Sequence, residues 1–146
     1  MTRDLSEVEA WVDAAEPVRL SEAGDDAWWA LSGRSDADRA VLERAFDHSA
    51  ATVTHASLRI DDEVVAIGQA AVALGHVAIF SMNTVERHRG RGLAGLVLDA
   101  LESWGRERGA RTACLQVVTG NTPAKRLYRA RGYVSKYAYE YLRAPG

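Results

Sequence analysis

The residues best suited to bind a ligand form a short turn rich in glycine and arginine, RHRGRGLA at positions 87–94. An extended apolar run, VAIFSMNTV, leads into this turn, and an amphipathic helix follows it directly. Gly90 and Gly92 allow unusual backbone dihedrals and a close approach to a ligand. The first amides of a helix lack intrahelical acceptors, and the helix dipole favours negative charge there. Because three arginines add positive charge, the turn is predicted to bind an anion.

Two familiar nucleotide-binding patterns are excluded at this turn. The chain contains no G-x-x-x-x-G-K-[ST] sequence. The third glycine of G-x-G-x-x-G is missing whether the count starts at Gly90 or at Gly92. A phosphate-binding turn of another kind therefore remains.

The elements around the turn predict a sheet with one parallel crossover. Three extended runs, at 52–60, 64–74 and 76–85, precede it and indicate an antiparallel meander. Helix 92–108 carries one apolar stripe at helical spacing, formed by Leu93, Leu96, Val97, Ala100, Leu101 and Trp104. The run RTACLQVV at 111–118 then predicts a strand, and a strand–helix–strand unit of this length implies a parallel crossover. Gly68 within the second run indicates a bulge or a close backbone contact.

The first fifty residues are predicted to be mostly helical. A capping-box spacing begins a helix at 6–15, and a short edge strand is expected at 17–21. Two further short helices are expected after Asp25-Asp26 and after Asp36. Trp28 and Trp29 could line a substrate groove, although core packing is the commoner role for such residues.

The last part of the chain repeats the strand-to-helix pattern. Asn121-Thr122-Pro123 supplies a cap and a first-turn proline, and Gly132 ends the helix. A tyrosine-rich run at 133–142 is expected to form the final strand. The predicted class is α/β, or α+β, with a mixed, mostly antiparallel sheet flanked by helices and a parallel crossover around helix 92–108.

Composition and charge narrow the class of protein. The 146 residues suit a single domain, with 47% apolar and 26% charged residues. No signal-peptide core and no apolar run of about 20 residues occurs, so a cytoplasmic protein without a membrane partner is expected. A single cysteine, Cys114, rules out an internal disulfide and a thiolate cluster, and no metal is expected. The chain is less basic than nucleic-acid-binding proteins usually are, so a nucleic-acid partner is not expected. Residues 1–50 hold 12 acids and 5 arginines, and residues 51–146 hold 8 acids and 13 basic residues.

The turn Arg89-Gly90-Arg91-Gly92-Leu93-Ala94 has the form R-x-x-G-x-A at the junction of a strand and a helix. A second set of residues follows in order, namely Leu115-Gln116-Val117, Asn121, Ala124, Leu127-Tyr128 and Gly132-Tyr133. Together the two sets resemble the GNAT superfamily of acyl-CoA-dependent N-acetyltransferases. The resemblance covers roughly residues 51–143, which would be the core with the coenzyme site, while residues 1–50 would form a helical acceptor-side segment of the same domain.

The resemblance implies a coenzyme site. Backbone amides of the turn, at Arg89, Gly90, Arg91, Gly92, Leu93 and Ala94, would hold the coenzyme's diphosphate. The preceding strand residues Met82, Asn83 and Thr84 would pair with the pantetheine arm and hold the acyl carbonyl, where each oriented amide is worth roughly 3–4 kcal/mol. Asn121 falls where a coenzyme-contacting asparagine is common. Arg87, Arg91 and Lys125 could reach the phosphates, or they could be solvated surface charges.

Tyr128 takes the position of the tyrosine that often protonates the departing thiolate. Its place on the apolar stripe of a helix also fits a core tyrosine. The general base is less defined, because some family members place a glutamate where this chain has Gln116, which cannot take a proton at neutral pH. The remaining candidates for the base are Glu86, His55, His76 and His88, and each could act through a water. Glu86 is the predicted base. A substrate could also arrive as a neutral amine.

These implications lead to an N-acetyltransferase that moves acetyl from acetyl-CoA to a primary amine, on a small molecule or a peptide, by direct attack in a ternary complex. The alternative is a non-catalytic acyl-CoA-binding or regulatory module of the same fold. The acidic amino-terminal segment favours a cationic acceptor. A helix before the first strand and one strand after the last helix depart from the family pattern, so the chain could also correspond to half of a two-domain member, alone or as a homodimer.

Overall fold

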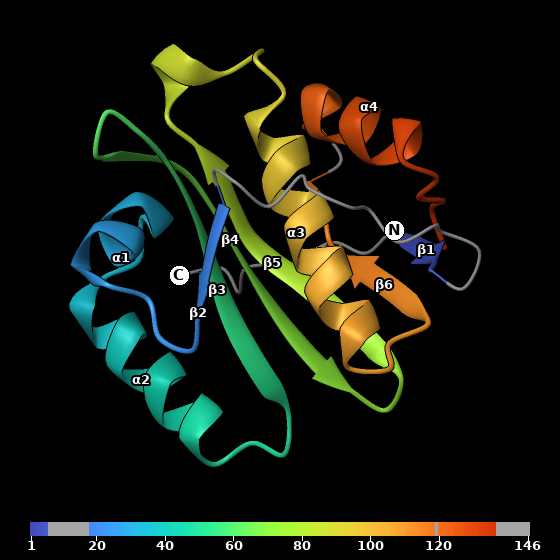
Figure 1. Ribbon diagram of the computed structural model, residues 1–146, viewed down its shortest axis with the longest axis horizontal. Coiled ribbons are helices and arrows are strands. Elements are labelled where there is room, and N and C mark those ends of the chain that lie inside the picture. Colours follow the sequence, from blue (N-terminus) through green and yellow to red (C-terminus); the bar gives the residue numbers. More distant parts are fainter. Residues whose placement is uncertain (6–17, 119, 137–146) are drawn as a thin grey trace, which may run out of the picture.

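The structure, a computed structural model, describes residues 1–5, 18–118 and 120–136 (Figure 1). Along the chain its elements are β1 (Thr2–Asp4), β2 (Val18–Ser21), α1 (Asp26–Ser32), α2 (Asp36–Asp47), β3 (Thr52–Ile60), β4 (Glu63–Ala73), β5 (His76–Thr84), the 3₁₀ turn η1 (Glu86–His88), α3 (Leu93–Glu107), β6 (Thr112–Leu115) and α4 (Thr122–Ala130).

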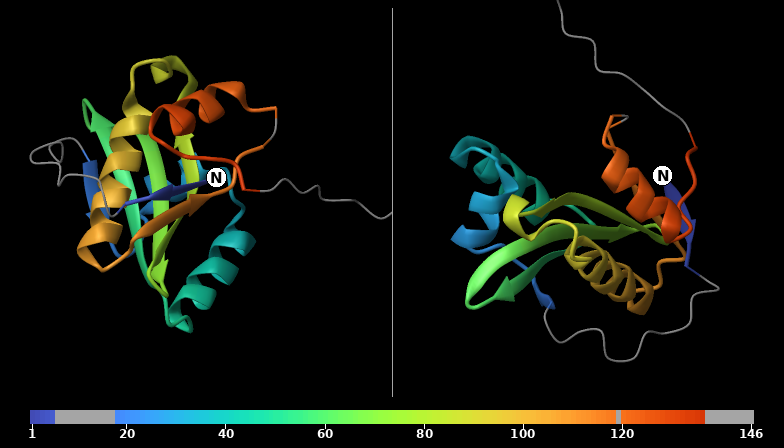
Figure 2. Two further views of the ribbon diagram at one scale, coloured as in Figure 1. Left: turned by 90° about the vertical axis from the view of Figure 1, so that its right-hand side faces the viewer. Right: turned by 90° about the horizontal axis from the view of Figure 1, so that it is seen from above.

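The strands form one six-stranded sheet in the order β1-β6-β5-β4-β3-β2. Only β5 and β6 run parallel, because helix α3 connects them as a crossover, and the other neighbours are antiparallel. Helices α1 and α2 cover one face and α3 covers the other (Figure 2). The predicted mixed, mostly antiparallel sheet flanked by helices is confirmed.

Helix α3 forms the main core with the sheet. Of the predicted stripe, Val97, Leu101 and Trp104 are buried, and Leu93, Leu96 and Ala100 are partly buried against the same core. Leu98, which the predicted stripe did not include, is also buried. Each large side chain buried there contributes about 1.5–3 kcal/mol. Gly105 lets the helix lie against Val77 of β5, since a Cβ there would lie 2.8 Å from that side chain. This packing holds the start of α3 at the end of β5.

Helices α1 and α2 begin at side-chain caps. Asp25 Oδ1 accepts from the amide of Trp28 at 2.9 Å, and Ser35 Oγ accepts from the amide of Asp38 at 3.1 Å. Trp28 and Trp29 are buried in a second apolar cluster, and Trp28 Nε1 donates to the carbonyl of Ala56 at 3.0 Å. Both tryptophans therefore pack in the core.

The two ends of the sheet differ from the expectation. Strand β1 was not predicted; it pairs antiparallel with β6, and Thr2 also bridges to Val134. Its three residues carry no alternating pattern, so only pairing with the exposed edge of β6 defines the strand. Strand β6 covers Thr112–Leu115, shorter than the predicted 111–118. The predicted helix at 6–15 and most of the predicted strand at 133–142 lie outside the described residues.

Replacement of Gly68 tests the packing of α3 on the sheet. A Cβ at this position would lie 2.6 Å from Met82 Sδ and 2.8 Å from a methyl carbon of Leu101. Gly68→Ala is expected to lower the free energy of unfolding by about 1–3 kcal/mol, because overpacking must move these groups. Urea unfolding measures the change. Gly120→Ala is the control, since no heavy atom lies within 4 Å of its added Cβ, and an equal loss in both variants would contradict the packing argument.

Candidate active site

Strands β5 and β6 pair over only four residues, and the last pair is Ile79 with Leu115. Beyond that point β5 continues to Thr84, whereas β6 has ended. Within residues 1–5, 18–118 and 120–136, no strand pairs with β5 on this side after Ile79. The backbone groups along this edge can therefore pair with an extended ligand, as an exposed strand edge does.

A β-bulge in β5 lies at the point where β6 ends. The register between β4 and β5 shifts at Gly68, and Ser81 has a φ of 56°. The ring of Phe80 lies near the phenylalanine of α2, and the Ser81 hydroxyl reaches Gln69 on the same face. Two consecutive side chains thus point toward α1 and α2. Met82 then points toward α3, where its sulfur lies against Gly68.

The glycine turn connects β5 to α3 through η1. Gly90 and Gly92 have φ of 78° and 76°, in the left-handed region that favours glycine. The first α-helical hydrogen bond runs from Leu96 to the carbonyl of Gly92, and no side chain caps the helix. The amides of Leu93 and Ala94 therefore lack intrahelical acceptors at the positive end of the helix dipole. The turn has the local geometry of an anion site.

The arginines around the turn are partly engaged. Arg89 Nε donates to the carbonyl of Thr84 at 3.0 Å, which closes the turn over the end of β5. Arg87 forms an ion pair with Glu63 of β4. Arg91 lies 3.3 Å from the ring of His88 and is exposed. All three guanidinium groups come from the same short segment, so their positive charge surrounds the glycines.

The predicted strand residues at the free edge use their side chains for packing. Asn83 Nδ2 donates to the carbonyl of Leu31 in α1 at 2.9 Å. Thr84 is buried beside Ala66 of β4. The side chains of both residues are thus engaged within the fold.

Helix α4 begins on the same side of the molecule as the turn. Asn121 caps it, with Oδ1 accepting from the amide of Ala124 at 3.2 Å, and Pro123 occupies the first turn. Asn121 is exposed and Lys125 is half-buried. The Asn121 side chain that the sequence linked to coenzyme therefore also holds the helix start.

Tyr128 lies on the inner face of α4, 6% exposed, with its ring centroid 5.8 Å from that of Tyr133. Its hydroxyl has no hydrogen-bond partner among the described residues. Among the described residues, the one fully buried side-chain polar atom without a partner is Trp29 Nε1. Burial raises the pKa of Tyr128, so that the phenol carries its proton at neutral pH.

The candidate bases lie at different places. Gln116 is exposed just past the end of β6, and Glu86 is exposed on η1. His88 lies in the same turn as Glu86. His76 begins β5, eight residues before Thr84 and thus about 26 Å from it along the strand. His55 is buried on β3, on the face that α1 and α2 cover.

A buried polar chain on that face was not predicted from the sequence. His55 lies 3.1 Å from the carbonyl of Glu22 through Nδ1, and its Nε2 lies 2.9 Å from Gln69 Nε2. Gln69, fully buried, continues the chain to Ser81. Alternation along β3 and β4 does not show which residues of the two strands lie opposite each other. The register between the strands places His55 opposite Gln69. Burial lowers the pKa of His55 and favours its neutral form.

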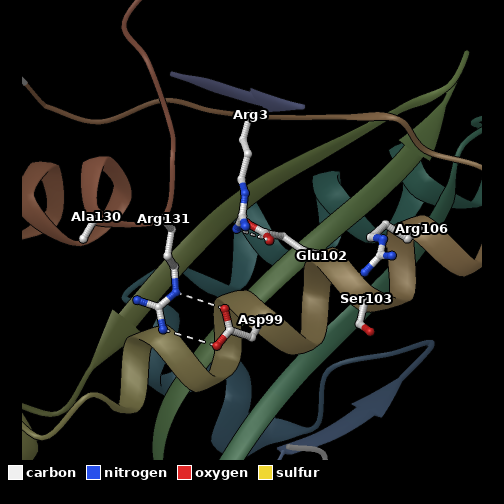
Figure 3. A pocket seen from close by; sticks show the side chains of 7 residues that line it. All are labelled: Arg3, Asp99, Glu102, Ser103, Arg106, Ala130 and Arg131. Carbon is white, nitrogen blue, oxygen red and sulfur yellow. Dashed lines mark hydrogen bonds and ion pairs between the residues drawn. The ribbon is translucent and has the colours of Figure 1, made fainter. Parts of the chain in front are cut away.

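A charged cavity of about 430 Å³ lies between α3, the end of α4 and β1 (Figure 3). Arg131 forms a bidentate pair with Asp99 of α3, and Arg3 of β1 reaches Glu102 at 2.7 Å. Tyr133 donates its hydroxyl hydrogen bond to the other oxygen of Glu102 at 2.7 Å. These pairs fasten α4 and β1 to α3. The two carboxylates are thereby neutralised, and they position Tyr128 through the helix that carries it.

Both the sequence and the fold of this chain are similar to those of known proteins. The acetyltransferase (GNAT) family matches residues 8–133. This chain belongs to the GNAT family. An uncharacterized N-acetyltransferase of Bacillus subtilis (strain 168), YobR, is 26% identical over 120 residues, which are 81% of this chain and 49% of YobR. The chain therefore spans about half the length of this curated relative.

Two solved structures have the same fold. An aminoglycoside acetyltransferase, AAC(6')-Iy, in complex with the bisubstrate analogue CoA-S-monomethyl-acetylneamine, superposes with a TM-score of 0.70 at 15% identity, covering 88% of this chain and 99% of that one. A predicted acetyltransferase of Clostridium acetobutylicum with acetyl-CoA gives 0.62 at 18% identity, covering 86% and 96%.

Membership of the GNAT family supports an acyltransferase that uses a CoA-type co-substrate. In the described part of the chain, no helix has the length and apolar character needed to span a membrane. Two groups that the sequence did not single out, Gln69 and Ser81, lie at the bulge of β5 next to its unpaired edge.

The buried histidine of this GNAT domain leads to a pH dependence of stability. Folding keeps His55 neutral, whereas the unfolded chain protonates it near the ordinary histidine pKa of about 6.5. Below that pH the unfolded state binds more protons, so the free energy of unfolding is expected to fall as the pH drops from about 7 toward 5. Urea unfolding at several pH values measures this slope.

His55→Gln is expected to remove most of that slope, since its side chain does not titrate. The exposed His48→Gln serves as the control and should keep it. The negative charge of Glu43 in α2 raises the pKa of His55 slightly against the effect of burial. Glu43→Gln should therefore change the pH dependence of stability only in part. The same slope in His55→Gln and the wild type would contradict the buried neutral assignment.

Proposed function

We propose that this chain transfers the acetyl group of acetyl-CoA to a primary amine by direct attack within a ternary complex. The main support is that the unpaired edge of β5 leads through the short turn η1 to the glycine turn at the start of α3. An extended pantetheine arm followed by a diphosphate has this shape. Family membership and the CoA ligands named for the two similar structures support the donor.

In this proposal the donor is bound mainly by backbone. The edge at Met82, Asn83 and Thr84 pairs with the pantetheine arm and orients the acyl carbonyl. Amides of the turn hold the diphosphate, and charged or polar side chains nearby reach its oxygens. The full set of coenzyme-binding residues is Met82, Asn83, Thr84, Arg89, Gly90, Arg91, Gly92, Leu93, Ala94, Asn121 and Lys125.

The reaction needs one nucleophile and two proton transfers. The amine nitrogen attacks the thioester carbon, a C–N bond forms and the C–S bond breaks. The departing sulfur takes the proton of the Tyr128 hydroxyl, which burial keeps protonated. Direct attack is favoured over a cysteinyl intermediate because burial raises the pKa of the Cys114 thiol and keeps it protonated.

The amine proton leaves toward Glu86 through a water in this scheme. Gln116 cannot serve as a base, since an amide does not accept a proton at neutral pH. Glu86 is exposed, and its carboxylate has no ion-pair partner among the described residues. An exposed carboxylate acts only weakly as a base, so part of the rate depends on the fraction of substrate that arrives as neutral amine.

A cationic acceptor fits the surface of α1 and α2. Asp36 and Asp38 are exposed on α2, beside the face where Ser81 lies, and the exposed acids Asp26 and Glu43 form ion pairs with Arg39. Such a surface attracts positively charged amines by long-range electrostatics. The aminoglycoside-derived part of the ligand named for one similar structure is consistent with this acceptor class. Equal rates with neutral and anionic amines would exclude it.

A non-catalytic acyl-CoA-binding module is the alternative, supported by Gln116 and the weakly placed base. Calorimetry with acetyl-CoA, combined with a thiol-release screen over amines, distinguishes the two. Turnover with any amine favours the enzyme. Binding without turnover favours the module, and absence of binding would contradict both.

Replacement of Tyr128 tests the general acid. Tyr128→Phe is expected to lower kcat about 10²–10⁴-fold while acetyl-CoA affinity and unfolding change little, because only the proton donor is lost. Steady-state thiol release and calorimetry measure the two quantities. Near-normal kcat would reject the assignment.

Tyr133→Phe is the matched control for that variant, since the two rings are neighbours. Tyr133 donates to buried Glu102, so its loss leaves a buried carboxylate oxygen less satisfied. We expect this variant to lose about 1–3 kcal/mol of stability and to keep kcat within a few-fold. If Tyr133→Phe instead lowered kcat strongly and Tyr128→Phe lowered only the stability, Tyr133 would be the general acid and Tyr128 the structural residue.

Glu86→Gln tests the base. It is expected to lower kcat/KM most at acidic pH, where little substrate is neutral, and to leave acetyl-CoA affinity unchanged. The pH–rate profile with the best amine of the screen measures this. An unchanged profile would mean that the amine reacts without Glu86.

A further inference from the structure

A polar chain crosses the apolar face of the sheet beneath α1 and α2. His55 on β3, Gln69 on β4 and Ser81 on β5 are neighbours across three strands. His55 is 4% exposed and Gln69 is 0% exposed, and the edge of the Trp28 ring packs on the imidazole. Buried polar groups are costly unless they are hydrogen-bonded. Each donor in the chain must therefore face an acceptor.

That requirement defines the direction of every hydrogen bond. The carbonyl of Glu22 can only accept, so His55 Nδ1, 3.1 Å away, carries the proton. Neutral His55 then accepts at Nε2, and the amide nitrogen of Gln69, 2.9 Å away, donates to it. Gln69 Oε1 is left facing Ser81 Oγ at 3.4 Å. The amide oxygen carries no proton, so the hydroxyl proton of Ser81 lies between the two oxygens and points toward Gln69.

The outward side of Ser81 Oγ is consequently an acceptor. A hydroxyl oxygen has two lone pairs, and an inward proton leaves both of them outside the chain. Arg34, from the link between α1 and α2, already donates one N–H to Ser81 Oγ at 3.3 Å. The oxygen thus accepts from a cationic nitrogen donor in this structure, with a second lone pair remaining.

Ser81 lies at the place where acyl transfer would occur. It is two residues beyond Ile79, the last residue of β5 that pairs with β6. The bulge and its φ of 56° turn the Ser81 side chain toward α1 and α2, while Met82 points toward α3. A donor held along the edge of β5 and an acceptor arriving past α1 and α2 would meet at this residue.

We propose that Ser81 Oγ binds an N–H of the incoming amine and that Gln69 and His55 keep it an acceptor by drawing its proton inward. With one N–H held there, the amine lone pair can be directed at the thioester carbon. Ser81 takes up no proton in this role, because the Gln69 amide cannot pass one on. This inference rests on the proposed acyl transfer and adds the residue that orients the attacking amine.

A pair of coenzyme derivatives tests this inference without knowledge of the natural acceptor. In one, the CoA sulfur carries CH₂–C(=O)–NH–CH₃; in the other it carries CH₂–C(=O)–O–CH₃, which is nearly isosteric but lacks the N–H. Calorimetry with CoA and both derivatives gives three affinities for each variant. The wild type is expected to bind the amide about tenfold more tightly than the ester, since the ester oxygen faces an acceptor that it cannot satisfy.

Variants at Ser81 and Gln69 test which members of the polar chain cause the preference for the amide. Ser81→Ala and Ser81→Gly are expected to bind amide and ester equally, and the glycine variant also removes any strain from the positive φ. Gln69→Met frees the serine proton to turn outward, so it should improve ester binding and narrow the ratio. Ser57→Ala is the matched control: Ser57 lies two residues after His55 in β3, outside the chain, and should keep the tenfold ratio.

The outcomes separate this inference from the proposed function. A ratio unchanged by both Ser81 variants, or absent in the wild type, would overturn the role of Ser81 while CoA binding still supported the donor site. No binding of CoA itself would overturn both. Nitrogen-15 NMR of His55 gives an independent check: protonated Nδ1 and unprotonated Nε2 are expected, and the reverse tautomer would overturn the direction of the chain.

Discussion

The parting of β5 from β6 after four residue pairs is the constraint on which the candidate site depends. The two strands are held together below that point by α3, whose Gly105 packs on Val77 of β5. Above it, β6 ends, and β5 continues to Thr84 paired with β4 on its other side before η1 and the glycine turn follow. The unpaired edge and the first amides of α3 are therefore contiguous, since both belong to one strand–turn–helix segment. Between the edge and the first amides of α3, the amides of Val85, His88 and Arg89 are bonded within the protein.

Side chains around this segment are largely used to hold the structure. Asn83 fastens α1, Asn121 caps α4, and Arg89 closes the turn. The Arg131–Asp99 pair fastens the end of α4 to α3. Backbone geometry is therefore what the fold offers to a coenzyme, and the Tyr128 hydroxyl is an exception because none of the described residues bonds to it. In the proposed donor site, recognition by backbone would be insensitive to side-chain identity, so a short R-x-x-G-x-A turn could suffice to bind the diphosphate.

The bulge at Ser81 connects the donor side of the sheet to the acceptor side. One residue inserted in β5 changes the alternation, so that Phe80 and Ser81 both point toward α1 and α2. Gly68, opposite the bulge, leaves room for Met82 on the other face. The buried chain from His55 then ends at the only point of β5 where the register is broken. In the proposed scheme, neighbouring residues of one strand would therefore contact both the acceptor and the donor.

Local patterns alone determined much of this protein. Extended apolar runs defined β3, β4 and β5, and the apolar stripe defined α3. Asp25, Asp36 and Asn121 marked three helix starts, although the structure shows that Ser35 is the residue that caps α2. These signals act between residues close in the chain. The glycine turn, on which the proposed donor site rests, is a local signal of the same kind. Strand β1, the end of β6 and the alignment of His55, Gln69 and Ser81 were decided only by the tertiary structure. Each of these depends on pairing between distant strands, and strand register is set by the whole sheet rather than by the residues of one strand.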